Sequence, residues 1–281
     1  MDKLFFLAIP GLSLREFLLS FRIAKTYAYK MQTDKLVEVN GEYRDFSYIL
    51  KPGDAVSIDI ESFEIGTIET YDYPLAIIYE DEDILIVNKP QGMLVHSDGH
   101  DNKTLNNAVA YHYQQEGIKR RVRHCHRLDY ETGGLLLYAK HFLAHAFLND
   151  QIEKRSFKKK YYALVTGKMQ PESGLIDLKI GRNRHLRNQY MVSHTGKESL
   201  TYYQTIKSNE KSSLLDIEIR TGRTHQIRVH FSHLHHPLIG DAIYGTPGQK
   251  LMLEAYYMSF IHPRTREIVE FFLPVPDDFW P

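Results

Sequence analysis

The sequence predicts an α+β protein: a mixed, largely antiparallel central sheet with flanking helices, preceded by a small N-terminal α/β module. Residues 1–60 contain two short helical segments followed by two strand-like segments with glycine turns. From residue 161 onward, several strand-like segments follow one another across short turns. That order favours antiparallel or mixed pairing over a repeated βαβ pattern, in which each strand would be followed by a helix.

The N-terminal module is expected to span residues 1–62. Leu14, Phe17, Leu18 and Phe21 have the i, i+3, i+4, i+7 spacing of one helical face. Ser13 precedes this run and Glu16 follows three residues later, which predicts a capping box at the start of the helix. The remaining segments are a second helix over residues 26–31, a strand over 36–39 that ends in an Asn-Gly turn, and a strand over 55–60.

The main domain is expected to span residues 63–281. Residues 61–83 hold eight acidic residues and no Lys or Arg, and we interpret them as a solvated linker that leads into a strand over residues 75–79. A β-branched segment over residues 83–88 predicts a buried strand, which Pro90 ends because proline cannot continue a strand ladder. Thr104 is a candidate N-cap for the next helix.

The second half of the chain alternates between basic and strand-like segments. A polar loop over residues 126–134 leads into an apolar strand, and a helix is expected over residues 141–153. A basic segment over 154–160 leads into a strand over 161–165, and Arg182, Arg184 and Arg187 lie in a later turn. Thr224 is a candidate cap for a last helix. Further strands are expected over residues 176–180, 189–192, 200–206, 214–219, 251–261 and 270–273.

The net charge of zero hides a strongly basic segment. Residues 119–228 hold 22 Lys or Arg and 10 Asp or Glu, a net charge of +12, whereas residues 1–118 carry a net charge of −9. This segment is either a binding surface for a polyanion or part of a mixed charged surface. Cys125 is the single cysteine, which fits a reducing cytoplasm, and no apolar run approaches the ~20 residues of a membrane span.

Several classes of active site are disfavoured by the motifs. The 15 histidines match no zinc-ligand spacing, the Gly133-Gly134 pair lacks the pattern of a phosphate-binding loop, and no G-x-S-x-G elbow is present. A glycosidase needs a second placed acid, and nothing in the sequence places Glu131 for that role. What remains is Asp129 among arginines and near a tyrosine. An aspartate beside an arginine stays ionised and can act as a nucleophile or a base, which points to chemistry on a nucleotide.

Three segments identify a family. They are Val87-Asn88-Lys89-Pro90 with Gly92 and His96, then His126-Arg127-Leu128-Asp129 with Thr132 and Gly134, and finally the ten residues from Thr221 to His230. Together they strongly resemble the RluA-type RNA pseudouridine synthases over roughly residues 74–275. One departure is Gly133, where the family usually has Ser. Residues 1–62 resemble the S-four-like RNA-binding module, named for a ribosomal protein, that often precedes this domain.

The resemblance implies catalytic roles for three residues. Asp129 would be the nucleophile or base that starts cleavage of the glycosidic bond of a target uridine, by attack on the base, attack on the sugar or removal of a sugar proton. Tyr161, rather than Tyr162, would stack on the uracil and help remove the proton at carbon 5. Arg223 would pair with Asp129 and keep it ionised. Other motif residues would bind the substrate: Arg127, His126, Lys89 and Arg228.

The resemblance further implies a pseudouridine synthase fold, a monomer that needs no cofactor or metal, and a structured RNA substrate, either ribosomal or transfer RNA. Two other functions are compatible with parts of the sequence. A non-catalytic RNA-binding or ribosome-assembly protein could retain the fold, but the presence of Asp129, Tyr161 and Arg223 argues against it. A uridine-specific glycosidase would use the same carboxylate but would not need a segment with a charge of +12.

Overall fold

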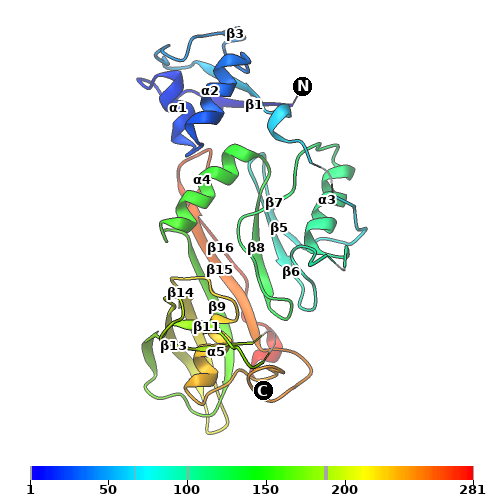
Figure 1. Cartoon of the computed structure of the whole chain (residues 1–281), viewed down its shortest axis with the longest axis vertical. Helices are drawn as coiled ribbons and strands as arrows, with labels where there is room; N and C mark the ends of the chain where they lie inside the picture. The colour runs from blue at the N-terminus through cyan, green and yellow to red at the C-terminus, as the bar shows by residue number, and fades with distance from the viewer. Residues whose placement is uncertain (1, 67, 100, 187–188, 281) are drawn as a thin grey trace.

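The computed structural model describes residues 2–66, 68–99, 101–186 and 189–280. The molecule is elongated, with the N-terminal module at one end and the C-terminus near the other (Figure 1). The predicted α+β class and the mixed, largely antiparallel sheet are confirmed. Among the described residues, no helix is long and apolar enough to cross a membrane.

The N-terminal module is a four-stranded antiparallel sheet packed against two helices. Its strands lie in the order β1-β4-β2-β3. The capping box at Ser13 and Glu16 is present, and the Asn40-Gly41 turn joins β2 to β3 with both residues at positive φ. The first strand was not expected from the sequence. The elements are β1 (Lys3–Leu7), α1 (Leu14–Ser20), α2 (Lys25–Thr33), β2 (Val37–Val39), β3 (Glu42–Tyr43) and β4 (Ala55–Asp59).

A ten-stranded sheet is the centre of the main domain. Eight strands follow the order β10-β13-β14-β9-β15-β8-β6-β5, while β16 pairs with β15 and β7 with β8. The β15–β8 pair is parallel and the other pairs are antiparallel. The strands are β5 (Ile77–Glu80), β6 (Ile84–Lys89), β7 (Arg123–His124), β8 (Gly133–Ala139), β9 (Lys158–Thr166), β10 (Ser173–Asp177), β13 (Leu200–Ser208), β14 (Ser212–Ile219), β15 (Leu253–Ile261) and β16 (Ile268–Phe272).

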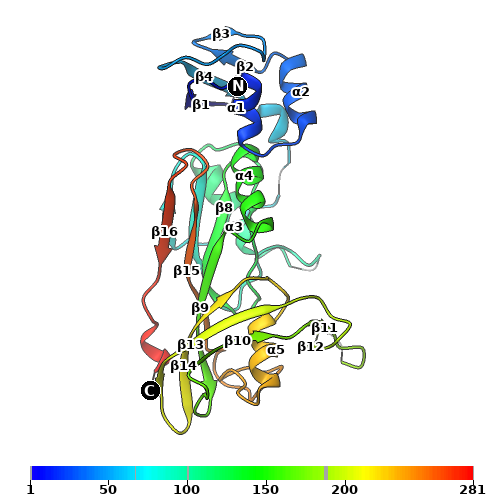
Figure 2. The ribbon, with the colours of Figure 1, turned by 90° about the vertical axis from the view of Figure 1, so that its left-hand side faces the viewer.

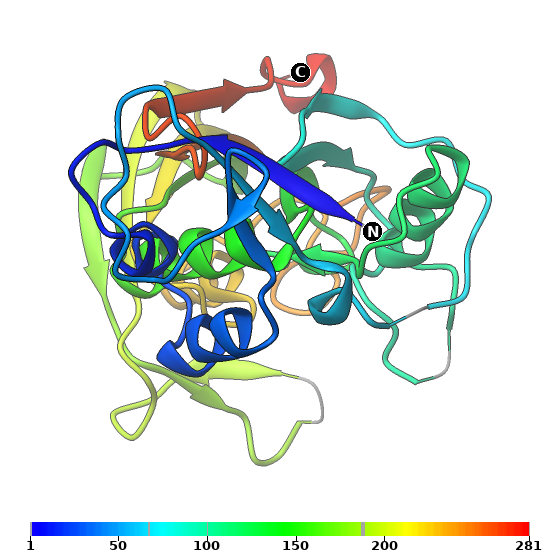
Figure 3. The same ribbon diagram turned by 90° about the horizontal axis from the view of Figure 1, so that it is seen from above.

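Three helices and a separate hairpin complete the main domain: α3 (Leu105–Gln115), α4 (Phe142–Glu153), α5 (Gln226–His233), and the pair β11 (Ile180–Arg182) and β12 (Tyr190–Val192). Helices α4 and α5 and the β11–β12 hairpin lie on one side of the long strands and β16 on the other (Figure 2). Seen from above, the hairpin projects well beyond the body of the domain (Figure 3). Arg182 ends β11, whereas the predicted turn residue Arg187 lies outside the described residues.

The acidic stretch before the main domain is largely exposed, as we expect of a linker, but Glu64 within it is buried. It begins with the short helix η1 (Glu61–Phe63). Glu64 is 4% exposed; it forms an ion pair with Arg123 and accepts a 2.9 Å hydrogen bond from the backbone N–H of Phe142. The Phe63 ring stacks on that of Phe142 at 4.7 Å. These contacts fix the segment after the N-terminal module against the start of α4, and the ring of Tyr27 in α2 lies 5.7 Å from that of Phe142.

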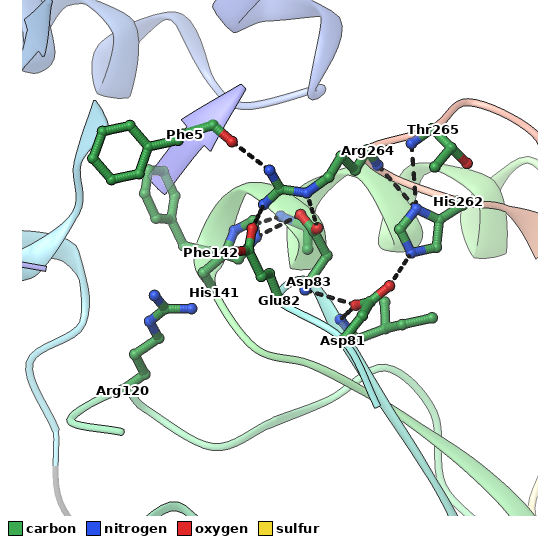
Figure 4. A network of polar contacts seen from close by, with 12 residues as sticks. Phe5, Asp81, Glu82, Asp83, Arg120, His141, Phe142, His262, Arg264 and Thr265 are labelled. Atoms are coloured by element: carbon green, nitrogen blue, oxygen red, sulfur yellow. Dashed lines mark hydrogen bonds and ion pairs between the residues drawn. The ribbon is translucent and has the colours of Figure 1, made fainter. Parts of the chain in front are cut away.

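Arg264, in the turn between β15 and β16, makes a second connection between the two parts (Figure 4). Its guanidinium pairs with the fully buried Asp83 and donates to the main-chain carbonyl of Phe5 in β1. The same group lies 4.4 Å from the centre of the Phe6 ring. Asp83 also bonds His141 Nε2 at 2.8 Å. One arginine therefore connects the N-terminal sheet to a buried acid of the main domain.

Candidate active site

A cavity of about 620 Å³ lies where the loop before β8, the strand β9 and the start of α5 meet. Asp129, Tyr161 and Arg223 all line it, as do Arg127, His126 and Arg228. Six of the seven predicted site residues are therefore gathered around one space, although they come from three segments spread over about a hundred residues. Lys89, the seventh, is not among the residues that line the cavity.

Asp129 lies in a tight turn at the edge of the cavity. Its carbonyl oxygen accepts a 3.1 Å hydrogen bond from the N–H of Thr132, which closes the turn before β8. Glycine is required directly after this turn: Gly134 has φ +111°, and a Cβ there would overlap the backbone of Ala255 in β15. The close pairing of β8 with β15 therefore presents the Asp129 carboxylate from a rigid position.

Tyr161 extends from β9 into the cavity and is 5% exposed. Burial raises the pKa of its phenol above the ordinary value of 10, and the negative charge of Asp129 raises it further. The phenol is therefore neutral near pH 7. Tyr162, the neighbouring candidate, does not line the cavity. Its ring stacks on Tyr256 at 3.7 Å, and Tyr256 bonds Asp216.

Arg223 does not pair with Asp129, which corrects our expectation. In the described part of the chain no ion pair joins the two residues; instead Arg223 Nε donates a 2.9 Å hydrogen bond to the carbonyl oxygen of Glu198. Thr224 is not the cap of α5 either. His225 occupies that position at φ 56°, and the buried Gln226 side chain accepts from Thr221 Oγ1 and the N–H of Arg223.

Arg228 is a cation held rigidly beside the loop that carries Asp129. It is 1% exposed, and its guanidinium makes two hydrogen bonds of 2.8 and 2.7 Å to the carboxylate of Asp241. It also forms a 2.9 Å ion pair with Glu131, two residues after Asp129. Although burial opposes ionisation of Asp241, the pairing with Arg228 holds the pKa of Asp241 below its usual range. These contacts make Arg228 a residue that fixes the loop, whereas we had expected a substrate contact.

Lys89 supports the same loop from below the cavity. It is 1% exposed, and its ammonium group donates to the carbonyl oxygens of Pro90 and Met93 at 2.8 Å and of Tyr130 at 3.3 Å. Burial lowers its pKa to about 8, and the charges of Asp129 and Glu254 oppose that shift. Because the Lys89 ammonium group is bonded to three main-chain carbonyl oxygens, its role is to order the Asp129 loop. This position does not support the predicted contact between Lys89 and the substrate.

The two histidines of the site differ in their surroundings. His126 is buried, its Nε2 accepts a 3.4 Å hydrogen bond from the N–H of Leu137, and burial holds its pKa well below 6.5. The imidazole is therefore neutral. His225 bonds the Tyr244 hydroxyl at 2.8 Å. Three further residues that organise the site were not singled out from the sequence: Gln226, Asp241 and Glu254.

Comparisons with known proteins identify the family. The RNA pseudouridylate synthase family matches residues 83–233. The uncharacterized RNA pseudouridine synthase YhcT of Bacillus subtilis is 39% identical over 267 residues, which cover 92% of this chain and 88% of the relative. This chain belongs to the RluA-type RNA pseudouridine synthases. The synthase is therefore an isomerase that converts uridine in RNA to pseudouridine.

Two other similar proteins extend the comparison. The ribosomal large subunit pseudouridine synthase D of Vibrio cholerae is 36% identical to the synthase over 266 residues, 86% of this chain and 80% of that protein. Among solved structures, the human RNA pseudouridylate synthase domain containing 1 superposes with a TM-score of 0.61 at 29% identity. That alignment covers 75% of this chain and 86% of the human protein.

Proposed function

We propose that the synthase isomerises specific uridines of a structured RNA, with Asp129 as nucleophile or base on a uridine that is flipped out of its stem. The bond between the sugar and nitrogen 1 breaks, the uracil turns, and a bond from the sugar to carbon 5 forms. The proton that leaves carbon 5 is balanced by one gained at nitrogen 1, so the reaction needs no oxidant or reductant. Flipping costs a few kcal/mol, less in a loop than in a helix.

The observation that carries this proposal is the placement of Asp129 and Tyr161 around one cavity. Both side chains line the same cavity of about 620 Å³, which supports a single uracil ring bound there in contact with both. A neutral aromatic ring is a suitable stacking surface for a base. Arg228 and Lys89 hold the Asp129 loop from two directions, which keeps the carboxylate aimed at the ring.

RNA binding is assigned to the basic groups around the cavity. Arg127, Arg155, Arg220 and Arg223 line it, and the projecting β11–β12 hairpin carries Arg182. We assign residues 1–62 to a separate S-four-like RNA-binding domain and residues 63–281 to the catalytic domain. The separate four-stranded sheet supports this division, as does a buried cluster that comes from residues 4–60 except for Phe142 and Leu143 of α4.

The substrate is ribosomal or transfer RNA, and we favour the RNA of the large ribosomal subunit. The support is the name of the Vibrio cholerae relative, which places that enzyme's action on the large subunit. On the same ground we propose that the synthase acts in the cytoplasm. We expect it to act as a monomer, because all the residues proposed for catalysis come from one chain.

The decisive experiment compares RNA from cells that lack the gene with RNA from cells that carry the wild-type gene or the Asp129→Asn variant. Pseudouridines are mapped across ribosomal and transfer RNA. We expect one site or a small set of sites to depend on wild-type protein and to be absent with Asp129→Asn, while the variant still binds RNA. Modification by Asp129→Asn at the wild-type level would refute the catalytic role of this carboxylate.

A further inference from the structure

Strand β9 begins with three consecutive lysines that have different surroundings. Lys158 is exposed and does not line the cavity, and Lys160 forms a 3.1 Å ion pair with Asp216. Lys159 lines the active-site cavity, as do its second neighbours Phe157 and Tyr161. Alternate residues of a strand point to the same side. Only the middle lysine of the three therefore shares the cavity with the proposed uracil-stacking ring.

Lys159 is a cation without a counter-charge. Within the described ranges, no hydrogen bond or ion pair to its ammonium group is found; the nearest ring, Phe157, has its centre 5.9 Å from Nζ. Burial lowers the pKa of Lys159 to about 8. Burying a positive charge without a partner costs free energy, and the cost is recovered when an anion occupies the site.

A second unused donor lies beside Lys159. The His126 ring centre is 5.6 Å from that of Phe157, and the positive charge of Lys159 helps to lower the pKa of His126, after burial. Because His126 Nε2 accepts from the backbone, the proton of the neutral ring lies on Nδ1. That buried nitrogen has no hydrogen bond of normal geometry among the described residues, although the main chain of Arg127 acts on the ring and opposes the lowering of its pKa. Two acids, Asp129 and Glu153, also line the cavity, but neither forms an ion pair with Lys159 in the described ranges. Two donors that are not matched by an acid favour an anionic ligand.

We propose that Lys159, assisted by His126, binds the RNA phosphate group next to the flipped uridine. This rests on the proposed stacking of uracil on Tyr161. Positions two residues apart on a strand, such as Lys159 and Tyr161, are separated by about 7 Å. This distance is comparable to that between a nucleobase and the phosphate of the same nucleotide. A base on Tyr161 would therefore bring its phosphate to Lys159. The site recognises a nucleotide through its backbone, whatever the sequence around the target.

The test uses three small probes: uridine, uridine 5′-monophosphate and uridine 3′-monophosphate. Their dissociation constants are measured by NMR titration against wild-type protein, Lys159→Met and the matched control Lys158→Met. We expect at least one monophosphate to bind wild type and Lys158→Met about tenfold more tightly than uridine, as a charge-assisted contact would produce. The preference should disappear in Lys159→Met and be largely kept in Lys159→Arg, which retains the charge.

Two results would overturn the proposal. One is a wild-type protein that binds neither monophosphate better than uridine, including the case in which no probe binds measurably. The other is a preference that persists in Lys159→Met. Tritium release from RNA labelled at carbon 5 of uridine gives a second measurement, in which Lys159→Met should raise KM and largely keep kcat. The probe titrations need no catalysis, so they can succeed or fail independently of the Asp129→Asn result.

Discussion

The carboxylate of Glu254 fills the space that a side chain at Gly133 would need. The two residues are direct neighbours in the parallel pair between β15 and β8, and a Cβ at Gly133 would overlap Glu254 Oε2. Gly133 is also the position where this chain departs from the family pattern. In this chain Glu254 therefore occupies, from the neighbouring strand, the space that a serine at position 133 would need.

Substitution at Gly133 should be tolerated far better than at Gly134. Gly133→Ser meets side-chain atoms only, the carboxylate of Glu254 and Cγ of Gln91, so we expect a loss of about 1 kcal/mol of unfolding free energy. Gly134→Ala meets the backbone of Ala255 at a positive φ and should lose about 3 kcal/mol or more. Urea unfolding measures both. In a Glu254→Ala background, Gly133→Ser should lose little unfolding free energy. An equal loss in the wild-type and Glu254→Ala proteins would refute the steric contact between positions 133 and 254.

Glu254 should make stability depend on pH. Burial raises its pKa from 4.5 to about 7. The folded state therefore holds a proton that the unfolded state has lost between these values, and stability falls as the pH rises through this window. Glu254→Gln should unfold with a flatter pH profile and be more stable than wild type above pH 7, by roughly 2–3 kcal/mol. Parallel profiles for the two proteins from pH 4.5 to 8 would contradict this prediction.

Arg228 should matter for folding and Glu131 for activity. Arg228→Met leaves the fully buried Asp241 carboxylate without its partner and should lose about 3–5 kcal/mol. The Glu131 side chain is 32% exposed, so Glu131→Gln should cost less than about 1 kcal/mol. Its kcat/KM should nevertheless fall about tenfold, because the Asp129 loop loses one attachment. A fully active Glu131→Gln protein would show that this ion pair does not position the loop.

Arg223→Ala should fold normally, because Arg223 is bonded to a main-chain carbonyl and not to a buried acid. We expect a change in unfolding free energy below about 1 kcal/mol. RNA affinity should fall, and the slope of log affinity against log salt should become shallower by about one, if Arg223 contacts a phosphate. Filter binding at several salt concentrations measures the slope. A loss of stability as large as that of Arg228→Met would restore a structural role for Arg223.

The sequence by itself determined the fold class, the helix start at Ser13 and Glu16, and the residue types of the site. These features depend on local signals: apolar spacing, capping residues and motifs that keep their order along the chain. Asp129, Tyr161 and Arg127 were all identified in this way, and all three line the cavity. The choice of Tyr161 over Tyr162 came from the family resemblance.

Only the tertiary structure decided which charges meet. Arg223 and Arg228 are five residues apart in one motif and both line the cavity. The turn at His225 lies between them, and Arg223 bonds the main-chain carbonyl of Glu198 whereas Arg228 pairs with the buried Asp241. Glu254 reaches Gly133 because β15 pairs with β8, and such a register between distant strands is not encoded locally. Likewise Asp83 looks like part of an acidic linker until Arg264, 181 residues later, is brought against it. Burial and strand pairing, set by the whole fold, assign these partners.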